Sequence, residues 1–153
     1  MPFALSPDRV AAARAFASAF VPGRRVCLTT HVNPDGDGLG SEAGLAHLLR
    51  SHGVDAVVTN PTPTPPRFSF LFEDMPGVDR TAEAIKELRR ADLIVVLDIS
   101  DLGRLGMLGE TVRDRGVPVA CIDHHVSAGV LPEGPRYLDA GAAATAELVF
   151  EIA

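Results

Sequence analysis

The chain has 153 residues, of which 46% are hydrophobic and 22% are charged, and its formal net charge is −6. This composition is typical of one globular domain with a substantial core, and it excludes a disordered chain. The acidic balance argues against a broad basic face for long duplex DNA, but it leaves small anionic substrates open if cations supply positive charge locally.

Targeting and redox signals are few. No apolar run approaches the roughly 18 residues that span a bilayer, and Asp8 and Arg14 interrupt any N-terminal signal pattern. We therefore expect a cytoplasmic protein with no membrane partner. Cys27 and Cys121 each lie inside an apolar run, which favours buried thiols over a disulfide or a metal site.

Predicted helices and strands alternate along the chain. Ser6 is expected to cap a helix within residues 6–20, and Gly53 is expected to stop a helix that starts near Gly38. Thr81 is expected to cap a helix over 81–90. The remaining elements are strands over 25–30, 54–59, 93–99, 117–123 and 136–139, a proline-rich loop over 60–67, and helices around 105–115 and over 142–152. Because most strands are apolar throughout, this order predicts an α/β domain, a parallel sheet with helices on both faces.

Polar residues collect where three of the predicted strands end. The strand over 25–30 runs into THVNPDGDGLGS (30–41), which supplies His31, Asp35 and Asp37. The strand over 93–99 delivers Asp98, and the strand over 117–123 runs into the sequence Asp123-His124-His125. Since the carboxyl ends of parallel strands share one edge of a sheet, we expect all three groups in one crevice.

This chemistry favours metal ions. Carboxylates that lie a few ångströms apart cannot all stay ionised without compensating charge. Imidazole mixed with carboxylate suits Mn²⁺, Mg²⁺, Fe²⁺ or Zn²⁺, and the imidazoles favour Mn²⁺ over Mg²⁺. The candidates are too many for one ion, so we expect two ions that share a carboxylate, as in enzymes that displace groups at phosphorus. Ser41, near a helix N-terminus, and Arg104, in the turn after Asp98, are candidates to bind phosphate.

Each cluster also has an ordinary interpretation. An Asn-Pro-Asp-Gly run is usually a turn, an aspartate after a strand is often a helix cap, and neighbouring histidines are often solvated. These interpretations require all three clusters to fall at strand ends by chance. His47 and His52, which have no acidic cluster nearby, are expected on the surface.

The three clusters together resemble the first three motifs of the DHH phosphoesterases. The stretches HVNPDGDGLGS, LDISDLGRLG and IDHH, with the tail AAATAELVFEI, are most similar to the branch of small oligoribonucleases that also dephosphorylate 3′-phosphoadenosine 5′-phosphate. The resemblance covers roughly residues 10–153. It implies a DHH-type N-terminal catalytic domain that acts on short oligoribonucleotides or small nucleotides with two divalent ions, Mn²⁺ or Mg²⁺.

The resemblance also implies a role for each motif residue. His31 and Asp35 would hold one metal, Asp37 and His124 the other, and Asp98 would bridge both. Asp123 would orient a ligand, and His125 would contact the scissile phosphate. A water or hydroxide between the ions would be the nucleophile.

One departure and several alternatives stay open. The family pattern continues with a fourth aspartate motif and a C-terminal substrate-binding domain, and residues 1–153 end before both. We therefore expect this chain to bind the first metal better than the second and to turn over poorly alone. Leu148, Val149 and Ile152 would be covered by following chain or by a second copy in a homodimer. Alternatives are an inorganic pyrophosphatase or a cyclic-dinucleotide phosphodiesterase of the same family, and a non-catalytic nucleotide- or metal-binding module.

Overall fold

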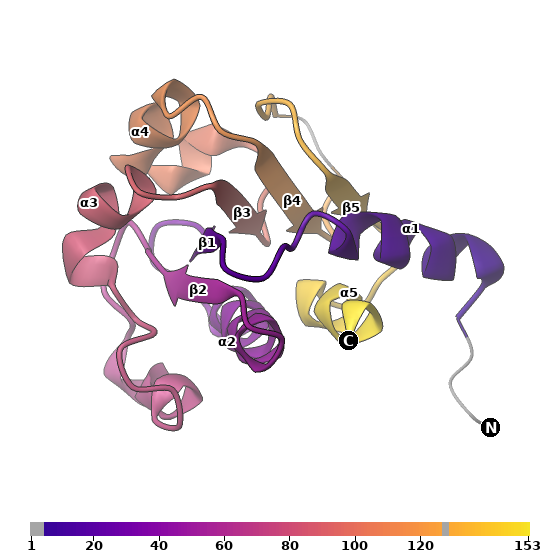
Figure 1. Cartoon of the computed structure of the whole chain (residues 1–153), viewed down its shortest axis with the longest axis horizontal. Helices are drawn as coiled ribbons and strands as arrows, with labels where there is room; N and C mark the ends of the chain where they lie inside the picture. Colours follow the sequence, from indigo (N-terminus) through magenta and orange to yellow (C-terminus); the bar gives the residue numbers. More distant parts are fainter. Residues whose placement is uncertain (1–4, 127–128) are drawn as a thin grey trace.

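The structure, a computed structural model, describes residues 5–126 and 129–153. Its centre is a sheet of five parallel strands in the order β2-β1-β3-β4-β5 (Figure 1). The strands are β1 (Arg25–Thr29), β2 (Asp55–Val58), β3 (Leu93–Leu97), β4 (Val119–Asp123) and β5 (Arg136–Leu138). The predicted parallel sheet is confirmed.

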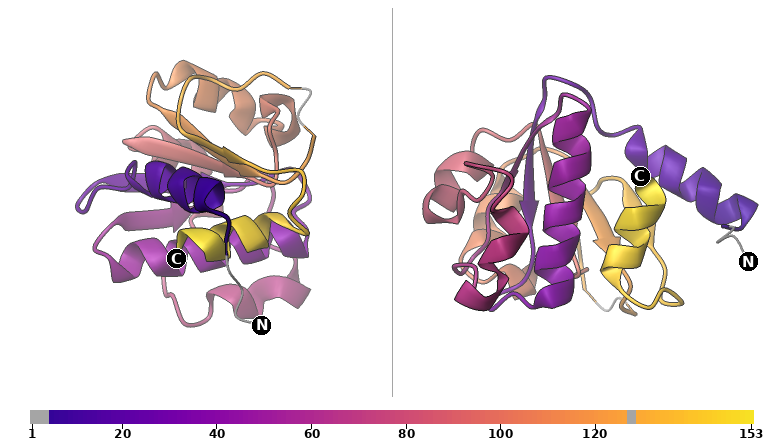
Figure 2. Two further views of the ribbon diagram at one scale, coloured as in Figure 1. Left: turned by 90° about the vertical axis from the view of Figure 1, so that its right-hand side faces the viewer. Right: turned by 90° about the horizontal axis from the view of Figure 1, so that it is seen from below.

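Helices cover both faces of the sheet, as predicted (Figures 1 and 2). One face carries α1 (Pro7–Ala17), α2 (Gly36–Ser51) and α5 (Thr145–Ile152), and the other carries α3 (Ala84–Leu88) and α4 (Leu108–Asp114). Side chains of a strand alternate between the two faces, so Val26 and Leu28 join the core under α2 while Cys27 joins the core under α3 and α4. Burial on both sides explains the continuous apolar strands in the sequence.

Local signals place two helix ends correctly. The Ser6 hydroxyl accepts a hydrogen bond of 3.3 Å from the Arg9 amide and caps α1. Helix α2 ends at Ser51, just before Gly53, whose φ of +77° is the left-handed conformation that glycine adopts at low cost. At its other end α2 begins at Gly36, earlier than predicted, because Asp35 supplies the cap.

One local prediction is wrong, and two segments form 3₁₀ helices that were not predicted. Thr81 does not cap an α-helix: it begins the 3₁₀ helix η2 (Thr81–Glu83), and its hydroxyl accepts from the Asn60 amide at 3.1 Å. The helix expected around 105–115 is present as α4, and the turn before it contains the 3₁₀ helix η3 (Leu102–Leu105), which ends at Gly106 with φ +53°. The segment after the proline-rich loop forms another 3₁₀ helix, η1 (Pro66–Phe72), and buries Phe72.

The expectation for the apolar side of α5 is also wrong. Leu148 and Val149 are buried within this chain, because α5 packs on α2 and α1. Ile152 is half-buried against the same core. Neither Leu148 nor Val149 therefore needs a second copy or further chain to leave water.

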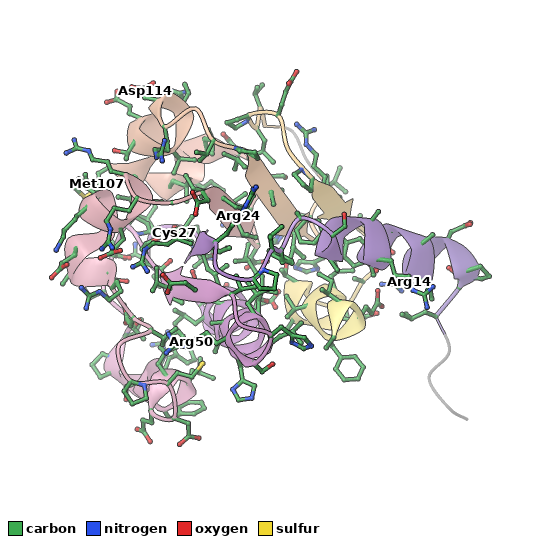
Figure 3. All side chains as sticks on the ribbon, viewed as in Figure 1. Arg14, Arg24, Cys27, Arg50, Met107 and Asp114 are labelled. Atoms are coloured by element: carbon green, nitrogen blue, oxygen red, sulfur yellow. The ribbon has the colours of Figure 1, made fainter. Side chains whose placement is uncertain are left out.

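Both cysteines are free and buried, as predicted. Burial raises the pKa of Cys27 and of Cys121 to about 12, so the thiols stay protonated near neutral pH and are poor metal ligands. Figure 3 shows Cys27 inside the domain, whereas Met107 and Asp114 lie at its outer boundary. Within residues 5–126 and 129–153, no helix combines the length and the hydropathy that a membrane crossing needs.

Candidate metal centre

The candidate site lies at the carboxyl end of the three central strands, β1, β3 and β4. His31 follows β1, Asp98 follows β3, and the sequence Asp123-His124-His125 begins with the last residue of β4. From β1 the chain continues to β2 at one edge of the sheet and then crosses to β3 on the other side of β1. Strands β1 and β3 therefore flank the topological switch point at which ligands bind in open α/β sheets.

The loop after β1 is held from both sides. The Thr30 amide donates to the Asn60 side chain at 3.0 Å, which anchors the start of the loop. Asp35 caps α2, since one of its oxygens accepts from the amides of Asp37 at 3.1 Å and Gly38 at 3.0 Å. A Cβ on Gly38 would lie 2.7 Å from the Thr30 hydroxyl, so only glycine allows α2 to approach the strand this closely.

One group of ligand atoms forms around His31. Its Nε2 lies 3.7 Å from Asp35 Oδ2 and 3.7 Å from Asp98 Oδ2. Its Nδ1 lies 2.9 Å from the Val32 carbonyl, which fixes the tautomer with the proton on Nδ1. Nε2 is buried and has no hydrogen-bond partner among the described residues, so its lone pair points toward the two carboxylates.

A second group forms around His124. Its Nε2 lies 3.5 Å from Asp37 Oδ2 and 3.6 Å from Asp98 Oδ1. Its Nδ1 lies 3.3 Å from the Ala142 carbonyl, which again leaves Nε2 free to face the carboxylates. Backbone carbonyls that orient imidazoles in this way are typical partners of metal-binding histidines.

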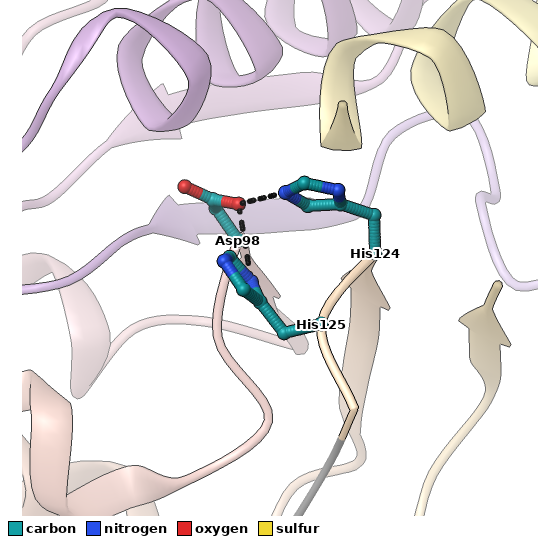
Figure 4. Close-up of side chains that lie close together, drawn as sticks. All are labelled: Asp98, His124 and His125. Carbon is teal, nitrogen blue, oxygen red and sulfur yellow. Dashed lines mark ion pairs between the residues drawn. The ribbon is translucent and has the colours of Figure 1, made fainter. Parts of the chain in front are cut away.

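Asp98 belongs to both groups through different oxygens. Oδ2 faces His31, while Oδ1 lies 3.6 Å from both His124 Nε2 and His125 Nδ1 (Figure 4). The residue is buried, and its φ of +63° is rare for a residue other than glycine. Burial raises the pKa of the Asp98 carboxyl, and the negative charges of Asp37 and Asp35 add to this; a hydrogen bond from Thr145 acts in the opposite direction.

His125 is oriented by Asp123. The buried Asp123 carboxylate accepts from the His125 amide at 3.1 Å and lies 2.7 Å from the ring Nδ1. The imidazole side chain is 48% exposed, so its other edge is open to solvent above Asp98. With the Nδ1 hydrogen directed at Asp123, the exposed Nε2 edge is free to contact a molecule bound at the site.

The two groups fit divalent metal ions. His31, Asp35 and Asp98 form one set of mutually close ligand atoms. The second group is His124 with Asp37 and Asp98. His125 also lies close to Asp98 and His124, but its Nδ1 is directed at Asp123. Ligand atoms on one ion, with bonds of about 2.1 Å, lie about 3 to 3.5 Å apart, only slightly closer than the atoms seen here. A bound cation would give the buried Nε2 of His31 a partner and would neutralise the neighbouring carboxylates.

The structure brings together all of the sequence-predicted ligand residues, whereas the two further phosphate-binding candidates lie differently. Ser41 is fully buried, and its hydroxyl lies 3.4 Å from Asp37 Oδ1. Arg104 is exposed on η3, and its side chain forms no ion pair with a described residue. His47 and His52 are exposed, as predicted.

Sequence reasoning missed the start of α5. The Thr145 hydroxyl donates to Asp98 Oδ1 at 2.8 Å, and the amides of Thr145 and Ala146 donate to the Asp37 carboxylate. The only sequence signal is a lone hydroxyl residue at the beginning of a predicted helix. Nothing in the spacing links Thr145 to aspartates 47 and 108 residues away.

Fold and site together define an α/β domain with a candidate divalent-metal centre at its central strand ends. The chain belongs to the DHH family: the model of the DHH family, N-terminal domain, matches residues 25–153. The resemblance predicted from the sequence motifs is confirmed.

Curated relatives of the chain carry a more specific name. The chain is 29% identical over 136 residues to the bifunctional oligoribonuclease and PAP phosphatase NrnA of Thermus thermophilus, covering 83% of this chain and 36% of the relative. It is 27% identical over 139 residues to the protein of the same name from Mycoplasma pneumoniae, covering 89% of this chain and 41% of the relative. The chain thus spans about two fifths of the length of these proteins.

Solved structures agree on the fold. An exopolyphosphatase-related protein from Bacteroides fragilis superposes with a TM-score of 0.77 at 24% identity, covering 99% of this chain and 44% of that one. The exonuclease RecJ bound to manganese gives a TM-score of 0.59 at 25% identity, covering 99% of this chain and 38% of that one. The RecJ structure holds manganese, one of the ions that the ligand chemistry here favours.

Proposed function

We propose that the chain is the catalytic domain of a metal-dependent phosphoesterase that hydrolyses short oligoribonucleotides or small nucleotides such as 3′-phosphoadenosine 5′-phosphate. The observation that carries the proposal is Asp98, whose two oxygens face separate groups of imidazole and carboxylate ligands. The similarity to the two NrnA proteins supports this substrate class.

Two divalent ions, Mn²⁺ in preference to Mg²⁺, complete the site in this proposal. His31 and Asp35 would hold one ion, Asp37 and His124 the other, and Asp98 would bridge them. Such ions lower the pKa of bound water and neutralise charge on phosphoryl oxygens. The manganese in the RecJ structure supports this choice of ion.

The chain's own residues would bind and orient the substrate. The exposed ring of His125, fixed by Asp123 through Nδ1, would contact a phosphoryl oxygen through Nε2, which in the protonated form donates to that oxygen and stabilises the charge that develops there. Arg104 lies on η3, directly after the loop that follows Asp98, where an exposed guanidinium can meet a second phosphate. Ser41 would act indirectly, because its hydroxyl donates to Asp37 and helps to orient that carboxylate.

A substrate comparison tests the proposal. The protein is incubated with Mn²⁺ and, in separate reactions, a 5′-phosphorylated diadenylate, 3′-phosphoadenosine 5′-phosphate, a cyclic dinucleotide and pyrophosphate. We expect the fastest release of product from one of the first two substrates, and no release when EDTA is present. Because residues 1–153 are expected to turn over poorly alone, relative rates at high protein concentration and long incubation are compared. Preferred hydrolysis of pyrophosphate or of the cyclic dinucleotide would assign another activity, and Mn²⁺ binding with no hydrolysis under these conditions would indicate a binding module.

A further inference from the structure

The first turn of α5 contacts both aspartates that the proposed function assigns to the second metal. The Thr145 amide donates to Asp37 Oδ2 at 2.9 Å, and the Thr145 hydroxyl donates to Asp98 Oδ1 at 2.8 Å. Thr145 is fully buried, so the bond to the buried Asp98 is shielded from water, whereas Asp37 is partly exposed. One residue therefore holds two carboxylates that come from different strand ends.

These contacts replace an ordinary helix cap. The residue at the N-cap position of α5, Ala144, has no side chain that can accept a hydrogen bond. The Asp37 carboxylate takes this place, because its two oxygens accept from the free amides of Thr145 and Ala146. The partial positive charge of the helix N-terminus further favours the ionised carboxylate.

The same contacts leave selected oxygens open. Asp98 Oδ2 accepts no hydrogen bond from a described residue and faces His31 Nε2 at 3.7 Å. The Thr145 hydroxyl occupies one lone pair of Oδ1 and thereby fixes the rotation of the carboxylate. Without this bond, no described side chain donates a hydrogen bond to Asp98; the nearest ring nitrogens of His124 and His125 lie 3.6 Å from Oδ1.

We infer that Thr145 is a positioning residue, which orients Asp98 through its hydroxyl and Asp37 through its amide so that both face the imidazoles. The inference rests on the proposed function, since it concerns the same metal centre. A charge-assisted hydrogen bond to an otherwise mobile carboxylate is a strong orienting contact in a buried site. Loss of such partners typically weakens metal binding about 10- to 100-fold.

Hydroxyl deletion tests the inference. Thr145→Val keeps the branched shape and the backbone amide but removes the hydroxyl that donates to Asp98. Thr145→Ala also removes the hydroxyl, and alanine has a high helix propensity, so this variant does not weaken α5 itself. Thr145→Ser keeps the donor. By calorimetric titration of Mn²⁺, we expect the dissociation constant to rise about 10- to 100-fold in the first two variants and to stay within about twofold in the third.

A matched control separates positioning from stability. Thr59 is also fully buried and donates its hydroxyl to the Leu28 carbonyl at 3.2 Å, away from the carboxylates. Thr59→Val should lower the melting temperature of the metal-free protein about as much as Thr145→Val does, because each loses one buried hydrogen bond, and should leave Mn²⁺ affinity unchanged. Equal Mn²⁺ affinity in Thr145→Val and the wild type would overturn the inference.

The remaining outcomes are also decisive. If neither Thr145→Val nor Thr145→Ala folds, the hydroxyl has a structural role and the inference is wrong. If the wild type binds no Mn²⁺, the proposed function fails first. If the wild type binds Mn²⁺ and hydrolyses nucleotides while the Thr145 variants match it, only the inference fails.

Discussion

Asp98 combines a strained backbone with a buried charge. Its positive φ directs the carboxylate away from the strand and into the space between His31 and His124. Aspartate and asparagine adopt this conformation more readily than other residues with a side chain, whereas alanine would be strained there. Conformational cost is commonly found at functional sites, where the surrounding structure enforces it.

Replacement of Asp98 by asparagine should separate stability from function. The raised pKa of Asp98 means that its ionised form opposes folding near neutral pH, so Asp98→Asn should melt at the same or a higher temperature without metal. The same variant should lose Mn²⁺ binding and lower kcat at least about 100-fold. Melting curves with and without Mn²⁺, together with hydrolysis rates, check both expectations; undiminished turnover would show that Asp98 does not bridge the ions.

Glu42 is a second buried acid with a marked pKa shift. It lies on α2, fully buried, and its side chain accepts from Asn60, the residue that also binds the Thr30 amide. Burial raises the pKa of Glu42 to about 8, the charge of Asp79 adds to the shift, and the hydrogen bond from Asn60 opposes it. The protonated form therefore dominates at neutral pH and links α2 to the loop after β1.

The protonation of Glu42 predicts a pH dependence of stability. Between the ordinary value near 4.5 and about 8, the folded protein keeps a proton that the unfolded chain releases. Folding stability should therefore fall as pH rises through this window, by at most about 1.4 kcal/mol per pH unit. Glu42→Gln should remove this contribution. The free energy of unfolding of the variant minus that of the wild type should therefore be larger at pH 8 than at pH 5.

Denaturant unfolding of both proteins at several pH values between 5 and 8 measures the effect. Other titrating groups cancel in the difference between wild type and variant. Stability curves that run parallel across the window would contradict the assigned pKa.

Helix α1 is attached to α5 and β5 by buried apolar side chains and by the ion pairs of Arg9. Arg9 lies 3.4 Å from Asp139, 3.4 Å from Glu147 and 2.9 Å from Glu151, whose side chain is fully buried. Glu151 also accepts from Tyr137 at the end of the sheet. Phe16 and Tyr137 pack beside these polar groups with ring centroids 6.4 Å apart.

Removal of Arg9 should loosen α1. Arg9→Ala leaves the buried Glu151 without its cation. Breaking a fully buried pair in this way typically lowers the free energy of unfolding by about 3 kcal/mol or more, and the loss here should be smaller because Arg9 is partly exposed to solvent. We expect a lower melting temperature and faster amide hydrogen exchange in α1. Arg14→Ala, on an exposed position of the same helix, is the matched control and should change neither; equal melting of the two variants would show that the Arg9 network does not stabilise the fold.

Binding of metal ions should stabilise the whole domain against unfolding. The ligand groups come from three strand ends and from the start of α2, so an ion that binds only the folded arrangement must stabilise the whole fold. At a free Mn²⁺ concentration 100 times the dissociation constant, binding adds about 2.7 kcal/mol to the free energy of unfolding.

Mn²⁺ should therefore raise the melting temperature, and EDTA should reverse the rise. The increase should shrink at acidic pH, because protons compete for the imidazoles and carboxylates. His47→Ala, at an exposed histidine away from the cluster, should keep the full increase and serves as a control for adventitious binding. A metal-induced increase that is the same in Asp98→Asn would place the binding elsewhere.

Sequence patterns were sufficient for the fold class and for most of the candidate site. Apolar strands alternating with helices predict a covered parallel sheet, and parallel strands necessarily bring their carboxyl ends to one edge. The sequence alone therefore groups His31, Asp35, Asp37, Asp98 and the sequence Asp123-His124-His125. Local chemistry also placed the Ser6 cap and the Gly53 stop correctly, since both depend only on neighbouring backbone.

Long-range packing settled what local patterns leave open. Whether Thr81 caps a helix depends on Asn60, whose backbone amide donates a hydrogen bond to the threonine hydroxyl. Whether Leu148 is covered depends on where α2 and α1 lie. The contacts of Thr145 with Asp37 and Asp98 join residues 108 and 47 positions apart, and no periodicity in a sequence encodes such a pairing. Strand ends follow from the covalent chain and its regular hydrogen bonding, whereas the side chains that hold the carboxylates in place follow from how separate elements pack.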